Sequence, residues 1–225
     1  MDFDGLSVDQ APPIWAPLRF FLTAPLFAIL AACLLFFGDA TSFMSRYSME
    51  SIVTVHAITI GFFSLVMLGA LTQMLPVLAG VKIPSVLTLA KLAHFAISIG
   101  LVLMIFGLLK SVSWMIFASS ALIGVGFLLL LLPMLFAFKK VANITSSVKA
   151  IAVSLVFATL SVFMGAHLLA SHGSGHFSQF HTALANVHSV WAIFGFAGVL
   201  IIGVAFHVLP MFYVAPRFKK FCKKR

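Results

Sequence analysis

Two histidines set inside apolar segments are the residues best suited to chemistry in this sequence of 225 residues. His56 lies about four residues into one such segment, and His188 lies about five residues into the last one. Ionisable side chains inside a membrane are costly, and they usually pair with one another or serve a function. Matched depths on two helices of the same direction suit two ligands of one metal. The alternative is a neutral imidazole that hydrogen bonds to a neighbouring helix.

The iron of a haem is the metal that two such imidazoles suit best. Neutral imidazole is a good iron ligand, and ligation by two histidines gives a low-spin b-type haem without a covalent attachment motif. The sequence contains no CxxCH, which excludes a c-type haem. We therefore predict a haem b between His56 and His188, near the outer membrane surface. If His167 replaces His188 as second ligand, the haem keeps its outer position.

The neighbours of the two histidines indicate how a flat macrocycle would fit. At 100° per residue, Gly195 lies within about 20° of His188 on the helical wheel, and a small residue there leaves space for the ring. Trp191 would form a wall of the pocket, and Phe63 shares the helix face of His56. Ordinary core packing is the alternative explanation for all three.

Histidines also occur at the other depths of the chain. His94 and His207 lie in the inner half, where they would bind a second haem, frame a quinone pocket or hydrogen bond to the backbone. The segment HLLASHGSGHFSQFH carries the outer group at irregular spacing and offers no cysteine or carboxylate. Such segments bind copper or zinc, or form a loop that responds to pH. The outer group consists of His167, His172, His176 and His181.

The elements that must position these histidines are membrane helices. The chain is 62% hydrophobic and 8% charged, far below the charge of soluble domains. A helix needs about 20 apolar residues to cross the hydrocarbon core. Six segments meet this requirement: 15–37, 53–79, 86–109, 113–138, 146–170 and 183–213. We predict an all-α polytopic membrane protein, a six-helix bundle forming one domain over 1–225, with the first segment retained rather than cleaved.

The distribution of positive charge predicts the topology. Six crossings place both termini on one side of the membrane, and only Arg46 and Lys110 fall on the other side. This asymmetry predicts cytoplasmic termini and a location in the cytoplasmic (inner) membrane. The net charge of +9 therefore reflects contact with lipid and not with nucleic acid. The cations of the terminal side are Arg19, Lys82, Lys91, Lys139, Lys140, Lys149, Arg217, Lys219, Lys220, Lys223, Lys224 and Arg225.

The second and sixth segments echo each other. GALTQMLPVL in the second corresponds to GVAFHVLPMF in the sixth. Three residue pairs share an offset of 134: Gly61 with Gly195, Gly69 with Gly203, and Pro76 with Pro210. Because glycine and proline are common in membrane helices, chance is the alternative explanation.

The same two segments resemble helices of subunit I of the haem-copper oxidases. HAITIGFFSLVMLGALTQMLPVLAG resembles its second helix, and NVHSVWAIFGFAGVLIIGVAFHVLPMF resembles a late helix that opens with His-x-His. The resemblance implies that His56 and His188 hold the low-spin haem and that the fold matches part of that subunit. It implies no oxygen-reducing centre, because Asn186 stands where the high-spin haem ligand would be and the copper-site motifs have no counterpart.

A second resemblance concerns the segments PLRFFLTAPLF and HAITIGF. They resemble the NnrS family of membrane proteins, which bind haem and copper and are linked to nitric oxide. The two resemblances cover the first, second and sixth segments and hardly touch the others.

Three functions follow from these patterns. The leading prediction is an electron-transfer cytochrome, with no catalytic residues of its own, that exchanges single electrons with a quinol or a periplasmic carrier. The first alternative is a membrane protein that handles copper or haem, or responds to nitric oxide, through its outer histidines. The second is a structural or assembly partner of a respiratory complex. A homo-oligomer would recreate a twelve-helix body like that of the oxidases.

Overall fold

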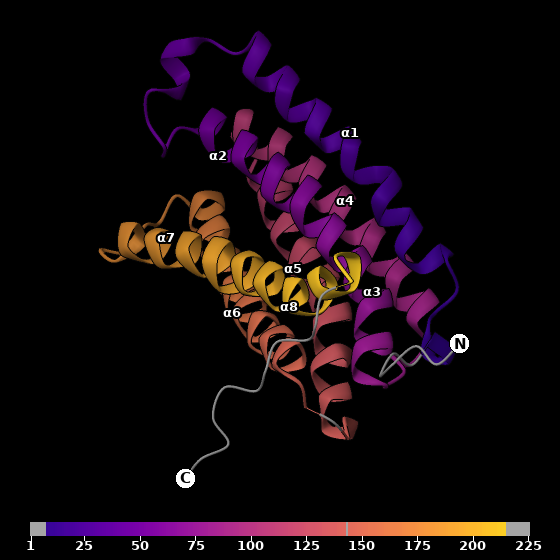
Figure 1. Ribbon diagram of the computed structural model, residues 1–225. Coiled ribbons are helices and arrows are strands. Elements are labelled where there is room, and N and C mark those ends of the chain that lie inside the picture. The colour runs from indigo at the N-terminus through magenta and orange to yellow at the C-terminus, as the bar shows by residue number, and fades with distance from the viewer. Residues whose placement is uncertain (1–7, 143, 215–225) are drawn as a thin grey trace.

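The computed structural model describes residues 8–142 and 144–214, and it is a bundle of helices (Figure 1). No β-strand occurs among these residues, and six helices are long and apolar enough to cross a membrane. The prediction of an all-α polytopic bundle is therefore confirmed. The basic residues from Arg217 onward, which contribute to the topology prediction, lie outside the described ranges.

Each span has a defined start and end in the structure. The first, third and fourth spans are α1 (Trp15–Phe37), α4 (Val86–Leu109) and α5 (Ser113–Ala137), the last continuing into a short 3-10 turn, η4 (Phe138–Lys140). The fifth span is α6 (Ser146–Ser174). The second span consists of α2 (Met49–His56), the π-helix η3 (Ala57–Ser64) and α3 (Leu65–Ala79). The sixth consists of α7 (His181–Val190), the π-helix η5 (Trp191–Gly198) and α8 (Val199–Phe212).

Local capping explains where the observed bounds differ from the predicted ones. The second span begins at Met49 rather than 53, because the Ser48 side chain accepts a hydrogen bond from the Ser51 amide and caps the helix. The fifth span continues beyond 170 to Ser174 and stops where Gly175 adopts a left-handed conformation, with φ of 70°. Part of the predicted outer loop is therefore helical.

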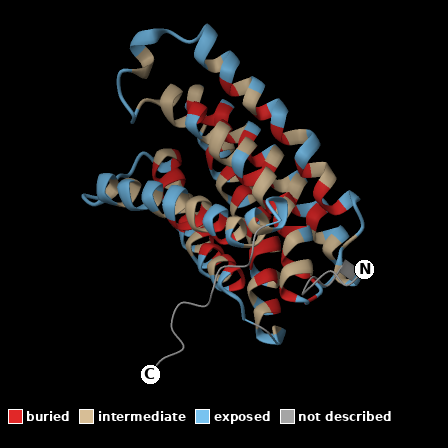
Figure 2. Cartoon of the chain, viewed as in Figure 1, coloured by how far each residue is buried: buried red, intermediate tan, exposed pale blue. Residues whose placement is uncertain are grey.

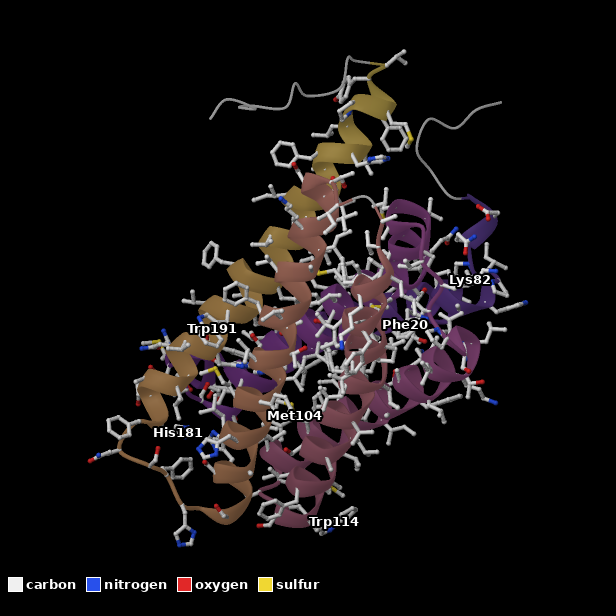
Figure 3. All side chains as sticks on the ribbon, turned by 90° about the horizontal axis from the view of Figure 1, so that it is seen from below. Phe20, Lys82, Met104, Trp114, His181 and Trp191 are labelled. Atoms are coloured by element: carbon white, nitrogen blue, oxygen red, sulfur yellow. The ribbon has the colours of Figure 1, made fainter. Side chains whose placement is uncertain are left out.

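Most of the packed core lies among the first five spans, and Phe196 and Leu200 of the sixth span join it (Figure 2). Phe20 of α1 is fully buried there, and its place among the helices is labelled in Figure 3. α4 and α5 approach each other closely through glycines: a Cβ on Gly100 would lie 2.9 Å from Ile123, and one on Gly126 would lie 2.7 Å from Ile97. Small residues of this kind permit tight packing of helices in membranes, where no hydrophobic force holds them together.

The sixth span has a different setting, because α6 is its main neighbour. None of the residues of α7 is buried, and the N-terminal ends of α2 and α7 diverge (Figures 1 and 2). Contact with α6 is close at Gly203, where a Cβ would overlap with Ala150. The second and sixth spans thus face each other without forming a packed interface.

The sequence echo reappears in the backbone of these two spans. The π-helices Ala57–Ser64 and Trp191–Gly198 have the same length and are offset by 134 residues, as the glycine and proline pairs are. Each ends with matching hydrogen bonds, from the Leu65 amide to the Ile60 carbonyl and from the Val199 amide to the Phe194 carbonyl. Turns of this i→i+5 type are rare and occur frequently at functional sites. The echo is therefore structural.

Candidate functional site

His56 and His188 lie together in the structure. The centres of their imidazole rings are 6.2 Å apart, and the ring planes are nearly parallel, at 9°. His56 is the last residue of α2, and His188 lies in the last turn of α7, so each histidine directly precedes the π-helix of its span. The two residues that the sequence paired by depth are thus neighbours across the space between the second and sixth spans.

The hydrogen bonds of the two rings determine which nitrogen carries the proton. His56 Nδ1 lies 2.7 Å from the Ile52 carbonyl oxygen, and His188 Nδ1 lies 3.0 Å from the Ser161 carbonyl oxygen. A carbonyl oxygen only accepts, so each Nδ1 must donate. In a neutral imidazole, Nε2 then carries the lone pair. This is the tautomer that metal-ligating histidines adopt when a carbonyl orients them.

The ring separation matches that of two ligands on one metal ion. A metal midway between two Nε2 atoms, about 2.0 Å from each, would place the ring centres about 6.2 Å apart, because a ring nitrogen lies about 1.1 Å from its ring centre. In the described residues no third His, Cys, Asp or Glu joins the pair to form a metal-binding group. A bare ion would therefore lack ligands, whereas the iron of a haem brings four nitrogens of its own macrocycle.

α6 supports His188 in two ways. Its Ser161 carbonyl accepts the Nδ1 proton, and its Gly165 leaves room for the ring, since a Cβ at this position would lie 2.9 Å from His188 Cε1. The Ser161 hydroxyl is buried and has no hydrogen-bond partner among the described residues. Sequence reasoning missed both residues, because a backbone acceptor and a single glycine leave no readable pattern.

The outer rim of the site contains a contact between distant parts of the chain. Arg46, in the loop before α2, donates a hydrogen bond to the side chain of Asn186 in α7. Its guanidinium also lies 4.7 Å from the centre of the Tyr47 ring. In the same loop Asp39 accepts hydrogen bonds from the Thr41 hydroxyl and amide, which lower the pKa of its carboxyl group. The only sequence signal for Arg46 was its rarity as an outer cation.

The three predicted pocket residues have other neighbours. Gly195 faces α6, where a Cβ would lie 2.5 Å from Phe157, and Trp191 meets the same Phe157 ring edge-on at 5.6 Å. Figure 3 labels Trp191 on the sixth span. Phe63 is half exposed and contacts the Phe62 ring. Gly195 and Trp191 thus contribute to the seam between the sixth span and α6.

The inner histidines do not share a setting. His94 Nε2 lies 2.8 Å from the Thr23 hydroxyl of α1, and the Phe20 ring packs edge-on against its imidazole at 5.4 Å. His207 instead lines a hollow between α3 and α8, opposite Gln73. In the described residues His94 thus has neighbours in α1, and His207 lines the hollow between α3 and α8.

The outer group is divided as well. His172 and His181 lie edge to face at 5.5 Å, and both contact the Phe177 ring. His181, labelled in Figure 3, has a buried Nδ1 without a partner among the described residues. His167 and His176 are exposed, and His176 Nδ1 lies 2.9 Å from the Ser174 carbonyl. Two of the four predicted ligands are thus adjacent, and none of the four shares a ring contact with His56 in the described chain.

A groove runs between α3 and α8, beyond the π-helices and toward the C-terminal ends of the two spans. It has a volume of about 420 Å³, and all its lining residues are apolar. At its inner end it meets a second hollow of about 210 Å³, with which it shares Met74 and Val208. The second and sixth spans, which carry His56 and His188, are therefore also separated by a groove between α3 and α8.

Comparison with known proteins identifies no relative. No family model matches the chain, no curated protein matches it, and no solved structure matches its fold.

Proposed function

We propose that this chain is an integral-membrane b-type cytochrome that holds a low-spin haem between His56 and His188 and transfers single electrons. The observation that carries the proposal is the ring pair, 6.2 Å apart and 9° from parallel, with both Nδ1 atoms engaged by backbone carbonyls. When bound, the haem iron supplies the change of redox state. The chain supplies ligands, orientation and an apolar surrounding, which together set the reduction potential.

The setting of the pair supports a macrocycle rather than a small ion. The outer ends of α2 and α7 diverge, and the rim between them carries Arg46. A haem with its carboxylate edge toward the outer surface would meet this guanidinium, which has donors left beyond the one that Asn186 accepts. The Ile52 and Ser161 carbonyls would keep both rings in the ligating tautomer throughout the redox cycle.

The resemblance to the low-spin haem helices of haem-copper oxidase subunit I is consistent with this proposal. The chain would be a reduced relative that retains one haem site and lacks the oxygen-reducing centre. We place it in the cytoplasmic membrane with both termini inside, so that the haem lies on the periplasmic side. A quinol or a periplasmic carrier is the partner that this position allows.

Optical spectroscopy of the purified protein tests the proposal. The reduced-minus-oxidised spectrum in mild detergent should show a low-spin b-type α-band, and a pyridine haemochrome should give one haem per chain. His56→Ala and His188→Ala should each abolish the band, whereas His94→Ala should keep it. A colourless protein after expression with ample haem would refute the proposal and favour a structural or assembly role.

A second candidate function rests on the contact between His172 and His181. Two adjacent imidazoles, one with a buried and unpartnered Nδ1, would bind copper, as expected of a protein that handles copper or responds to nitric oxide. Metal analysis of His172→Ala and His181→Ala distinguishes the two functions. Loss of copper with an intact haem band would assign copper to this pair, and no copper in the parent protein would reject it.

A further inference from the structure

The groove between α3 and α8 is built from the sequence echo. Its lining residues come in pairs offset by 134, and a single residue, Leu209, stands outside this pattern. Because the two spans run in the same direction, equivalent residues of α3 and α8 lie on opposite walls of the groove. The paired residues are Val66 with Leu200, Met67 with Ile201, Ala70 with Val204, Leu71 with Ala205, and Met74 with Val208.

Two polar residues lie at the inner end of the groove, and they show the same offset of 134 as the apolar pairs. Gln73 and His207 are offset by 134, and both line the inner hollow. Gln73 is exposed and forms no hydrogen bond within the described part of the chain. An amide without a partner is costly in hydrocarbon. A ligand that accepts a hydrogen bond would remove this cost.

The depth of the two polar residues argues against a phospholipid headgroup. Gln73 lies six residues before Ala79, the end of its span, which corresponds to about 9 Å along the helix axis. His207 lies five residues before Phe212, at a similar depth. Neither hollow has a Lys or Arg among its lining residues to attract a phosphate. The occupant should therefore have an uncharged polar head that lies within the apolar layer.

We propose that the groove binds an isoprenoid quinone, with its ring between Gln73 and His207 and its chain along α3 and α8. A quinone ring carries two carbonyl oxygens on opposite sides, so it accepts hydrogen bonds from two symmetric donors. Gln73 and His207 both carry N–H donors, and the apolar pairs above them suit a long branched chain. The site does not include His56 or His188, so it is independent of the haem.

Quantification of bound quinone tests this inference. The full chain is purified in mild detergent from membranes supplemented with a ubiquinone of defined chain length, and the quinone is extracted and measured per chain. We expect about one quinone per chain in the parent protein. Gln73→Leu and His207→Leu should each lower this occupancy about tenfold, the effect of one lost hydrogen bond. Ala70→Phe, which fills the groove, should lower it further.

His94→Leu is the matched control, because it removes an inner histidine outside the groove and should leave quinone content unchanged. The haem band and a single elution peak verify that each variant is folded. Quinone retained in both Gln73→Leu and His207→Leu, or phospholipid alone in the parent protein, would overturn the inference. Quinone without haem would refute only the haem proposal, and haem without quinone would refute only this one.

Discussion

Two environments of histidine inside the same bundle differ in which ring nitrogen is engaged. At the outer site His56 and His188 use Nδ1 to donate to backbone carbonyls, and their rings lie 6.2 Å apart. At the inner site His94 uses Nε2 to contact the Thr23 hydroxyl, and an aromatic ring packs against it. The first arrangement leaves Nε2 of both rings without a hydrogen bond in the described residues, whereas in the second Nε2 of His94 is hydrogen bonded.

The difference shows that burial of a histidine in a membrane span does not by itself indicate a ligand. His94 has the partner expected of a residue that links two helices, since Thr23 belongs to α1 and His94 to α4. In the described residues the hydrogen bonds of His56 and His188 involve Nδ1 only: the acceptor of His56 lies in its own span, and that of His188 lies in α6. The hydrogen bonds of the outer pair are therefore compatible with the proposed ligation, whereas the hydrogen bond of His94 links two helices.

Substitution of His56 or His188 should have the largest effect on haem content and should separate the two histidine environments. In the proposed cytochrome, His56→Ala or His188→Ala would leave the haem with one ligand from the chain. We therefore expect haem content to fall below about a tenth of the parent value, a loss of more than about 1.4 kcal/mol in binding. The pyridine haemochrome measures this content. If His94→Ala loses as much haem as either of them, the distinction between the two environments is wrong.

A smaller effect should follow from displacing one ligand. Gly165→Val introduces a Cβ 2.9 Å from His188 Cε1, so the His188 ring must move away from its carbonyl acceptor. We expect partial haem occupancy and a high-spin component in the oxidised spectrum. Gly124→Val is the matched control, because a Cβ there meets no atom within 4 Å. Equal spectra for the two variants would show that α6 does not position His188.

Removal of the rim cation should tune the haem rather than release it. Arg46→Gln removes a positive charge near the proposed haem. This charge would stabilise the haem carboxylates, and it would stabilise the reduced haem relative to the oxidised haem. We expect the haem to become harder to reduce, with a midpoint potential lower by up to about 60 mV, which corresponds to about 1.4 kcal/mol. Redox titration measures the shift.

The effect of Arg46→Gln should weaken with increasing salt, since the residue is exposed. Arg46→Lys should keep most of the parent potential because it retains the charge. Lys110→Gln removes the other predicted outer cation and serves as the control. A shift of equal size in Lys110→Gln would assign the effect to the overall field and not to a contact at the rim.

The sequence determined the spans well because the length of an apolar segment depends on the bilayer and not on tertiary contacts. The bounds Trp15–Phe37 and Val86–Leu109 match their predictions. The pairing of His56 with His188 followed from depth alone. The contact between Arg46 and Asn186 joins residues 140 positions apart, and no local pattern encodes it.

Gly195 has a neighbour that the helical wheel around His188 did not anticipate. The prediction that Gly195 lies beneath His188 assumed 100° per residue, yet the π-helix begins at Trp191, between the two residues. An i→i+5 helix turns less per residue, so Gly195 shifts around the helix and meets Phe157 of α6. The matching π-helix in the second span had no signal in the sequence other than the echo.

The smallest effect on the haem should come from the inner histidine's partner. Thr23→Val removes the hydroxyl that contacts His94 Nε2 while nearly keeping the side-chain volume, so a part-buried imidazole loses a hydrogen-bond partner. We expect a loss of about 1–2 kcal/mol in the free energy of unfolding and no change in haem content or midpoint potential. Thermal unfolding in detergent and the redox titration measure the two quantities. A changed haem spectrum in Thr23→Val would mean that the environment of His94 affects the outer pair. An unchanged free energy of unfolding would mean that the hydrogen bond to Thr23 does not stabilise the packing of α1 against α4.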